Sequence, residues 1–591
     1  MNRGKVLILG WLILLIGAAG SLRAVECGGV AVKLLPAIGD STDYGYQEAV
    51  FLVQNMTDQP HRVTIAIEST QGFGNNIRLS SVKKSLMLPP RADVRAKLFK
   101  LPVGMLLPRL SLFVDGKRYD SSDWGEKFSH IFNNGDGSYL SFPLVYLVSQ
   151  GVVPGKPGTV FSASRSFSGR SPSRSSSYDP KEIFYFIWSF LPVEQWSDSW
   201  LAYTGYLGVI LSREEWERLP AGARDALTRY AAGGGTLVLV GTPPADVAAG
   251  GKPHKMAKRV LDFGMMIYSA KNPAQYDKAE WRQLQELSSS NMQQWKSSIT
   301  PQTLFRELPL IKDDRLPFRP LFFMMLLFVL IIGPGNIFWL RRRKRMIWLL
   351  WTTPVIAILF SMAVVVYSLV AEGWHSRVRN NSLTILDENR QQAATIGIHG
   401  YYCPLPPGSG VKYSETTAVY PLQTSVESHS GAVDWSNGQL LSSDWIMSRI
   451  PTYFLVRRIE PRRERLQILA RTPVQMTVLN GIGTTLTNLH VAGPDGRVYR
   501  ATGPILSGEK AVLEFITPDM TARPETFDPR SQLGNITGYL ASFNPANVQL
   551  RPGTYCARMA ATPFLPPGIK PGELRDESCL YGILSVSGGK K

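Results

Sequence analysis

Three consecutive glycines, Gly233 to Gly235, are the first place in this sequence where chemistry could be sought. Glycine-rich turns beside strands hold phosphates or nucleophiles in many enzymes. A phosphate loop follows a strand and opens a helix, so that amide hydrogens and the helix dipole face the anion. Here the helical segment AGARDALTRYAA precedes the glycines and the apolar strand TLVLVG follows them. We therefore expect a scaffold turn, with Gly233 as a left-handed helix C-cap.

A catalytic nucleophile is the second chemistry that this strand could support. A nucleophile elbow places Ser or Cys directly after the strand, beside a base that activates it. This strand runs into the turn GTPP at 241–244, so neither Ser nor Cys follows it. His254 is the nearest histidine and could act as a base, although a surface position is the simpler interpretation. The sequence therefore predicts no catalytic residue and no cofactor-binding residue.

Metal ligation has equally little support. The motif HExxH and other paired ligand spacings are absent from the sequence. NNGDGS at 133–138 resembles part of a calcium loop, but it lacks the twelve-residue spacing and the final glutamate, so we expect a plain turn. We predict no metal site and no cofactor. The seven histidines are His61, His130, His254, His375, His399, His429 and His490.

The cysteines could form disulfides if the chain lies in an oxidising compartment. They are Cys27, Cys403, Cys556 and Cys579. In an oxidising compartment they could form up to two disulfides, with three alternative pairings. Proximity in the sequence favours the pair Cys556 and Cys579. No CxxC spacing occurs, so neither zinc binding nor thioredoxin chemistry is supported.

Two apolar segments predict a membrane hairpin. Residues 321–340 and 346–370 carry no charge, and about 20 residues suffice to cross the hydrocarbon core. A pair of buried soluble helices is the alternative. RRRKR at 341–345 stands between them and indicates the cytoplasmic side. The residues GPGN at 333–336 interrupt the first span, which suggests either a kink or close helix contact, or a docking point for a membrane partner.

The N-terminus predicts export. Arg3 and Lys5 precede the apolar run 6–19, and small residues follow as far as Ala24. This pattern is typical of a signal peptide over 1–24, with an uncleaved anchor as the alternative. Glu26 argues against lipidation of Cys27. Export, return through the first span and exit through the second place both large soluble parts outside the cytoplasm, with two main spans in the inner (cytoplasmic) membrane.

That topology changes the meaning of the net charge of +18. A basic chain would otherwise suggest nucleic acid as a partner. An extracytoplasmic position excludes chromosomal DNA. The expected partners are then the lipid bilayer with its anionic headgroups, a membrane protein, and an anionic envelope polymer.

The soluble parts predict three domains. Residues 26–122 show alternating strands with turn residues, typical of an Ig-like β-sandwich. Residues 371–591 predict an extracytoplasmic β-rich domain, where MTVLN and DGRVY echo FLVQN and DGKRY of the first; a second sandwich and a chance echo are both open. Residues 138–312 carry strands that are apolar on both faces, which predicts a parallel sheet covered by helices. The Ser/Arg-rich insertion at 162–177 is expected to be a mobile loop, or alternatively a polymer tether.

The segment LSREEWERLPAGARDALTRYAAGGGTLVLVG at 211–241 resembles the class I glutamine amidotransferase-like, flavodoxin-like domains of bacterial membrane-anchored proteins. IIGPGNIFWLRRRKR, with TTPVIAILFS after it, looks like a family of uncharacterised bacterial envelope proteins that combine a signal peptide, such an α/β domain, a helix hairpin and a β-rich C-terminal part. The resemblance implies a degenerate α/β three-layer domain, since the nucleophile is missing, and says almost nothing about activity.

The resulting hypothesis is a multidomain membrane protein: a β-sandwich, a flavodoxin-like α/β domain, a two-helix transmembrane hairpin and a C-terminal β-rich domain. Such a protein would be a non-enzymatic binding or accessory subunit of a membrane complex. The alternative from another class is an exported hydrolase or transferase acting on cell-wall or surface glycans, which would need acidic residues supplied by distant segments.

Overall fold

A computed structural model of the chain describes residues 24–39, 45–69, 78–105, 108–120, 145–152, 160–162, 185–189, 191–244, 256–288, 299, 301–310, 318–372, 375–422, 430–516, 525–526, 545 and 548–585. Nearly all of the predicted signal peptide and of the Ser/Arg-rich insertion lie outside the described residues, as does the turn at 133–138. His130, His254 and His429 also lie outside them. The expectations for these segments therefore stay predictions.

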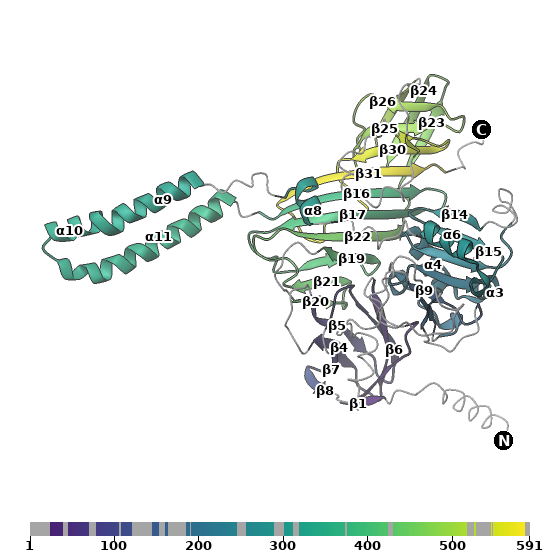
Figure 1. Cartoon of the computed structure of the whole chain (residues 1–591), viewed down its shortest axis with the longest axis horizontal. Coiled ribbons are helices and arrows are strands. Elements are labelled where there is room, and N and C mark those ends of the chain that lie inside the picture. Colours follow the sequence, from purple (N-terminus) through teal and green to yellow (C-terminus); the bar gives the residue numbers. More distant parts are fainter. Residues whose placement is uncertain are drawn as a thin grey trace.

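The described part of the chain is mostly β-sheet, with a hairpin of apolar helices that projects away from the sheets (Figure 1). Within it, four sheets have four strands or more. A fifth pairs β28 (Glu525–Thr526) with β29 (Val548–Gln549). The expectation of a β-rich chain with several sheets and two apolar helices that could span a membrane is thus confirmed in its coarse form.

Two sheets form the lower part of the molecule in Figure 1. The first has the order β1 (Val25–Cys27), β2 (Val30–Leu34), β3 (Gln47–Asn55) and β6 (Asp93–Lys100). The second has the order β18 (Val411–Tyr413), β21 (Gln439–Ser443), β20 (Ser430–Asp434), β5 (Arg78–Leu88), β4 (His61–Ser69), β7 (Pro108–Val114) and β8 (Lys117–Asp120). Every second side chain of β3 is buried, as its alternating sequence predicts.

The second sheet contains strands from both ends of the chain. β20 runs parallel to β5, so that Gly431 lies opposite Leu79 and Val433 opposite Val82. The sandwich strands predicted within 26–122 are present. They are nevertheless completed by residues that the sequence assigned to the C-terminal domain, so the proposed division into domains stays a prediction.

A mostly parallel sheet forms the third layer. Its order is β10 (Val160–Ser162), β11 (Tyr185–Trp188), β9 (Val145–Val148), β12 (Gly208–Ser212), β13 (Thr236–Val240), β15 (Gly264–Ser269) and β14 (Ala257–Leu261). The five strands β11-β9-β12-β13-β15 are parallel, and their chain order reads 2-1-3-4-5. The strands β9, β12 and β13 are buried on both faces and almost entirely apolar. This is the pattern from which a parallel sheet covered by helices was predicted.

The helices of this layer begin and end where local sequence signals place them. They are α3 (Arg213–Arg218), α4 (Ala221–Ala232) and α6 (Lys278–Ser288), with the 3-10 turn η5 (Trp200–Tyr203) before β12. Ser212 caps α3 in a capping box: its hydroxyl accepts from the Glu215 amide at 3.1 Å, and the Glu215 side chain accepts from the Ser212 amide at 3.0 Å. This capping box fixes the residue at which α3 begins.

At the C-terminus of α4, the left-handed glycine lies one position later than predicted. Gly233 has φ −77°, whereas Gly234 has φ +105°, so Gly234 and not Gly233 is the left-handed residue. The amide of Gly235 donates to the Tyr230 carbonyl at 2.9 Å and that of Gly234 to Ala231 at 3.1 Å. This pair of bonds is a Schellman motif, in which the left-handed residue lies one position beyond the cap.

An eleven-stranded sheet dominates the C-terminal part. Its order is β19 (Thr417–Leu422), β22 (Thr452–Pro461), β17 (Gln392–Tyr402), β16 (Arg377–Asp387), β31 (Glu573–Ile583), β30 (Thr554–Met559), β25 (Leu486–Ala492), β26 (Val498–Ala501), β27 (Lys510–Phe515), β24 (Gln475–Gly481) and β23 (Arg465–Arg471). β31, from the end of the chain, runs parallel to β16. α8 (Pro301–Glu307) lies against this sheet through the Leu308 carbonyl, which accepts from the Tyr453 hydroxyl at 2.9 Å.

The echo between the two β regions has a physical basis. Asn55 ends β3 and Asn480 lies near the end of β24, and both are buried. In each, the side-chain oxygen accepts from the amide two residues on, at 2.9 and 3.1 Å, and the nitrogen donates to the carbonyl four residues on, at 2.7 and 2.8 Å. The same turn therefore closes a strand in two different sheets.

The apolar hairpin consists of α9 (Phe318–Leu330), the π-helical turn η7 (Ile331–Gly335), α10 (Asn336–Arg342), η8 (Met346–Trp348) and α11 (Leu349–Glu372). Two stretches, Phe322–Arg342 and Met346–Tyr367, are long and apolar enough to cross a membrane. Their apolar side chains are largely exposed, unlike those of a soluble core helix. The predicted interruption at 333–336 is present as the π-helical turn around Pro334.

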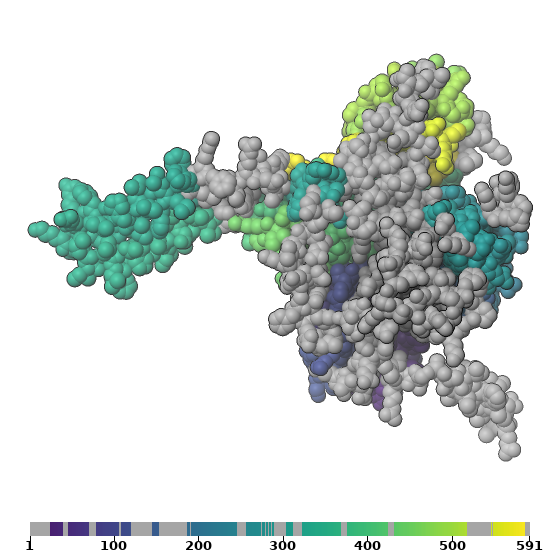
Figure 2. Space-filling model, viewed as in Figure 1, coloured from purple at the N-terminus to yellow at the C-terminus, as the bar shows by residue number. Residues whose placement is uncertain are grey.

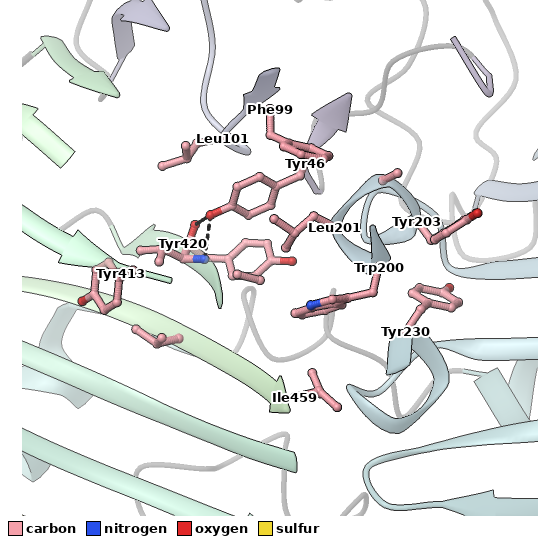
Figure 3. Packing of buried hydrophobic residues seen from close by; sticks show 14 of the residues in the cluster. Tyr46, Phe99, Leu101, Trp200, Leu201, Tyr203, Tyr230, Tyr413, Tyr420 and Ile459 are labelled. Atoms are coloured by element: carbon pink, nitrogen blue, oxygen red, sulfur yellow. Dashed lines mark hydrogen bonds between the residues drawn. The ribbon is translucent and has the colours of Figure 1, made fainter. Parts of the chain in front are cut away.

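A shared core joins the layers (Figure 3). Tyr46 donates from its hydroxyl to the Val419 carbonyl at 3.2 Å and accepts from the Val419 amide at 2.8 Å. Trp200 donates to the Thr416 carbonyl at 2.9 Å. The N-terminal sheet, the α/β layer and the eleven-stranded sheet therefore pack as one body around these aromatic residues.

Candidate binding site

The triple glycine lies where α4 meets the eleven-stranded sheet, at the amino edge of the parallel strands. A Cβ at Gly235 would lie 2.3 Å from the Tyr230 ring, and one at Gly233 would lie 2.8 Å from Ile459 on β22. The Gly233 carbonyl accepts a hydrogen bond from Arg457 Nη1 at 2.7 Å. The glycines thus permit close packing between two layers, which agrees with the scaffold interpretation.

Arg457 makes this contact as a buried cation, 2% exposed. Its Nη2 also donates to the Tyr420 hydroxyl. The guanidinium carbon lies 5.4 Å from the Trp200 ring centroid and 5.1 Å from that of Tyr420. A cation is favoured at the carbonyl end of a helix and over aromatic faces. The amino edge is therefore held to β22 by charge as well as by packing.

A buried carboxyl group adds a second contact at this edge. Asp262, in the turn between β14 and β15, accepts from Gln392 Nε2 at 3.1 Å and lies 3.8 Å from Arg390 Nη1. Both partners belong to the hairpin between β16 and β17. Burial raises the pKa of Asp262 to about 7, although Arg390 opposes the shift.

At the opposite, carboxyl edge, the loops after β9 and β12 diverge, the position where doubly wound sheets bind ligands. The buried Glu215 carboxylate fills this crevice. One oxygen accepts from the Gly151 amide at 2.8 Å, and the other accepts from the Ser212 amide and the Ser149 hydroxyl. A Cβ at Gly151 would lie 2.6 Å from the carboxylate. The crevice is thus closed by an anion of the chain itself.

A cavity of about 350 Å³ opens one strand further along the same edge, beside the turn after β13. It lies between α3, the start of α4 and the strands β13, β15 and β14. Its charged lining consists of three arginines and one glutamate, and its aromatic lining of Trp216 and Tyr268. The charged residues are Arg213, Arg224, Arg259 and Glu217.

The lining of this cavity has more cationic than anionic side chains, and two of its arginines are oriented by backbone carbonyls. Arg213 Nη1 donates to the Thr242 carbonyl at 2.8 Å, and its Nε lies 3.4 Å from Glu217. Arg224 Nη2 donates to the Glu217 backbone carbonyl at 2.9 Å, and the guanidinium lies over the Trp216 ring at 5.8 Å. Carbonyl contacts orient a guanidinium without neutralising it. Planar arginine donors suit carboxylate and phosphate groups, so the cavity is a candidate anion-binding site.

The histidines found in the described residues do not assemble into a reactive site. His399 is fully buried on β17, where Nδ1 lies 3.1 Å from each hydroxyl of Tyr401 and Tyr413. Burial lowers the pKa of His399 to about 3, so it is neutral near pH 7. His61, at the start of β4, pairs at 2.6 Å with Asp115 in the turn between β7 and β8 of the second sheet. No group of three or more metal-ligating side chains occurs in the described part.

The favoured disulfide is not formed. All four cysteines are free thiols. Cys556 lies opposite Tyr581 in the ladder and Cys579 lies opposite Arg558, so the two cysteines are diagonal neighbours on adjacent strands. Diagonal partners are farther apart than a disulfide allows. Burial raises the pKa of Cys579 to about 12, which disfavours the reactive thiolate.

The cavity was not predicted from the sequence. The turn at 241–244 was judged only by its lack of a Ser or Cys nucleophile, and nothing in the sequence connects this turn with arginines from three other elements. The only available signal was the arginine content of REEWER and RVLD, which does not differ from that of an ordinary solvated surface.

Comparisons with known proteins add no family to this description. No family model matches the chain, and no curated protein matches it in sequence. Among solved structures, the yeast delta-COP-I mu-homology domain, alone or with a bound peptide, covers 35% of this chain and 95% or 96% of its own, at 6% identity and TM-score 0.18. A score this low carries no argument about fold or function.

Proposed function

We propose that the chain is a non-enzymatic, membrane-anchored envelope protein whose α/β layer binds an anionic group as part of a membrane complex. The observation that carries this proposal is the cavity lined by three arginines and one glutamate. Such a surface attracts carboxylate or phosphate groups, and Trp216 offers an aromatic wall for the face of a sugar.

The placement of the cavity supports the same proposal. Strand order 2-1-3-4-5 is that of flavodoxin-like sheets, which bind ligands beyond the carboxyl ends of their strands. We therefore infer a degenerate flavodoxin-like domain of the amidotransferase-like kind. Its usual crevice is filled by Glu215, and the neighbouring arginine cavity is a concave site formed by the described residues at this edge.

The cellular setting is part of the proposal. A signal peptide, two spans and the basic loop at 341–345 would place the α/β layer outside the cytoplasm of a bacterium. An anionic envelope polymer then becomes the expected ligand. A membrane protein contacting the hairpin becomes the expected partner.

Binding is tested by isothermal titration of the full chain in detergent micelles with trigalacturonate, against neutral maltotriose. We expect the acidic trisaccharide to bind and the neutral one not to bind. Arg213→Gln should weaken binding about tenfold, the effect of roughly 1.4 kcal/mol from one lost charge-assisted bond. Arg218→Gln is the matched control, because Arg218 lies on the same helix outside the cavity and pairs with Glu194 at 3.7 Å.

Equal effects of the two substitutions would mean that general surface charge, and not the cavity, attracts the ligand. Cleavage of either trisaccharide would favour the exported hydrolase or transferase instead. The partner is tested separately, by affinity purification from gently solubilised membranes after in-cell crosslinking. Absence of any stoichiometric membrane protein would remove the accessory-subunit part of the proposal.

A further inference from the structure

A groove of about 540 Å³ runs between the two apolar helices near the loop that joins them. Three tryptophans, Trp339, Trp348 and Trp351, lie along it, and each is at least half exposed. In Figure 2 the hairpin stands clear of the described sheets. The described sheets therefore do not cover the groove.

The π-helical turn and one polar pair shape this groove. Gly335 at the end of the turn lines it, together with Asn336 and Thr352. Asn336 Nδ2 donates to the Thr352 hydroxyl at 2.9 Å, and that hydroxyl lies 3.1 Å from Asn336 Oδ1. Such a mutual contact satisfies polar groups within an apolar hairpin. It links the helices across the groove, whose remaining lining is apolar.

Cations stand at the mouth of the groove. Arg343 lies over the Trp339 ring at 4.7 Å, and Arg345 lies over the Trp348 ring at 5.9 Å. Both tryptophans also line the groove. The sequence from 318 to 371 contains no acidic residue, and Glu372 lies at the far end of α11, so the five cations at 341–345 have no acidic neighbour in the sequence at the loop end of the hairpin. An apolar trough therefore ends at a positive rim.

We propose that this groove binds one anionic phospholipid, with the phosphate at Arg343 and Arg345 and an acyl chain along the tryptophan-lined wall. Tryptophan is enriched at membrane interfaces, and basic pockets between membrane helices bind anionic headgroups. The volume is within the usual range for ligand sites. A zwitterionic lipid carries its own cation, which opposes the arginines. The site requires the hairpin to lie in a membrane and is independent of the cavity in the α/β layer.

Native mass spectrometry of the full chain tests this site. The chain is stripped of lipid in detergent and then incubated with phosphatidylglycerol or phosphatidylcholine. We expect a single retained phosphatidylglycerol and no retained phosphatidylcholine. Arg343→Gln with Arg345→Gln should abolish retention. Arg341→Gln with Arg342→Gln is the matched control, because it removes the same charge from the loop and neither residue has a cation–π contact among the described residues.

A second variant keeps every cation and fills the groove. Val355→Trp adds bulk to the apolar lining and should also abolish retention, with helical content checked by circular dichroism. Equal loss in both double variants would overturn the site, since charge alone would then explain binding. Equal retention of both lipids, or retention in Val355→Trp, would overturn it too. A protein crosslinked in the groove of a chain that retains no lipid would replace the lipid with a partner helix.

Discussion

The amino edge and the carboxyl edge of the parallel sheet differ in what their charged side chains contact. The amino edge carries the triple glycine and is packed against the eleven-stranded sheet, with Arg457 and Asp262 as its buried charged contacts. The carboxyl edge carries Glu215 in its central crevice and the arginine cavity beside it. One edge uses its charges for attachment, and the other gathers three arginines and one glutamate around a cavity.

This difference shows why a glycine motif is a poor guide to a site. The glycines are required because backbone and rings approach closely at the attached edge. At the carboxyl edge, the cavity depends on arginines that no local sequence motif connects. Three substitutions test how firmly the two edges differ, and they are ordered by the size of the effect expected.

Arg457→Ala should have the largest effect. It removes a buried side chain and leaves the Gly233 carbonyl and the Tyr420 hydroxyl without this donor. We expect the free energy of unfolding to fall by about 3–4 kcal/mol. Urea unfolding of the full chain in detergent measures it, with the exposed Arg463→Ala at the end of the same region as control. An effect no larger than that of the control would show that the amino edge is not held by this cation.

Glu215→Ala should have the next largest effect. The hydroxyl of Ser149 and the amides of Gly151 and Ser212 would lose their acceptor in a buried crevice. We expect a loss of about 2–3 kcal/mol. The neighbouring exposed Glu214→Ala is the control and should change stability by less than about 0.5 kcal/mol.

Added formate tests whether a free carboxylate can replace the Glu215 side chain in this crevice. If the crevice is an anion site filled internally, millimolar formate should raise the thermal midpoint of Glu215→Ala and leave the natural chain unchanged, because ligand binding to the folded state stabilises it. A variant that unfolds as easily with formate as without it would contradict the view that Glu215 replaces a ligand.

Asp262 predicts a pH dependence at the attached edge. Its pKa is near 3.8 in the unfolded chain and is raised to about 7 in the folded chain. The carboxyl is protonated in both states below about pH 4, so its full contribution is present there and is lost as the pH rises through 7. Stability should fall by about 2 kcal/mol between pH 5 and pH 8.

Asp262→Asn should remove this slope, because an amide does not ionise. Asp225→Asn, at a surface carboxyl of α4 paired with Arg229, should leave it intact. The measurement is urea unfolding at four pH values. An unchanged slope in Asp262→Asn would assign the pH dependence to another group.

Much of the local structure could be predicted from the sequence. Ser212 as a cap, the limits of α4, the strands β12 and β13 and the apolar hairpin follow from periodicity and capping, which depend on neighbours within a few residues. The left-handed glycine was misplaced by one position, and the disulfide was wrong because strand register is not visible in spacing. The resemblance to amidotransferase-like domains stays a prediction.

Alternation, capping and apolar length are local properties, so the residues alone indicate several of the strands, the helix α4 and the two stretches that suit a membrane. The pairing of β20 with β5, the contact of Arg457 with a helix end 224 residues away, and the shared cavity of Arg213, Arg224 and Arg259 depend on the folded chain. These contacts join residues far apart in the chain, and many alternative pairings satisfy the same local pattern. Packing and charge in the folded state select among them.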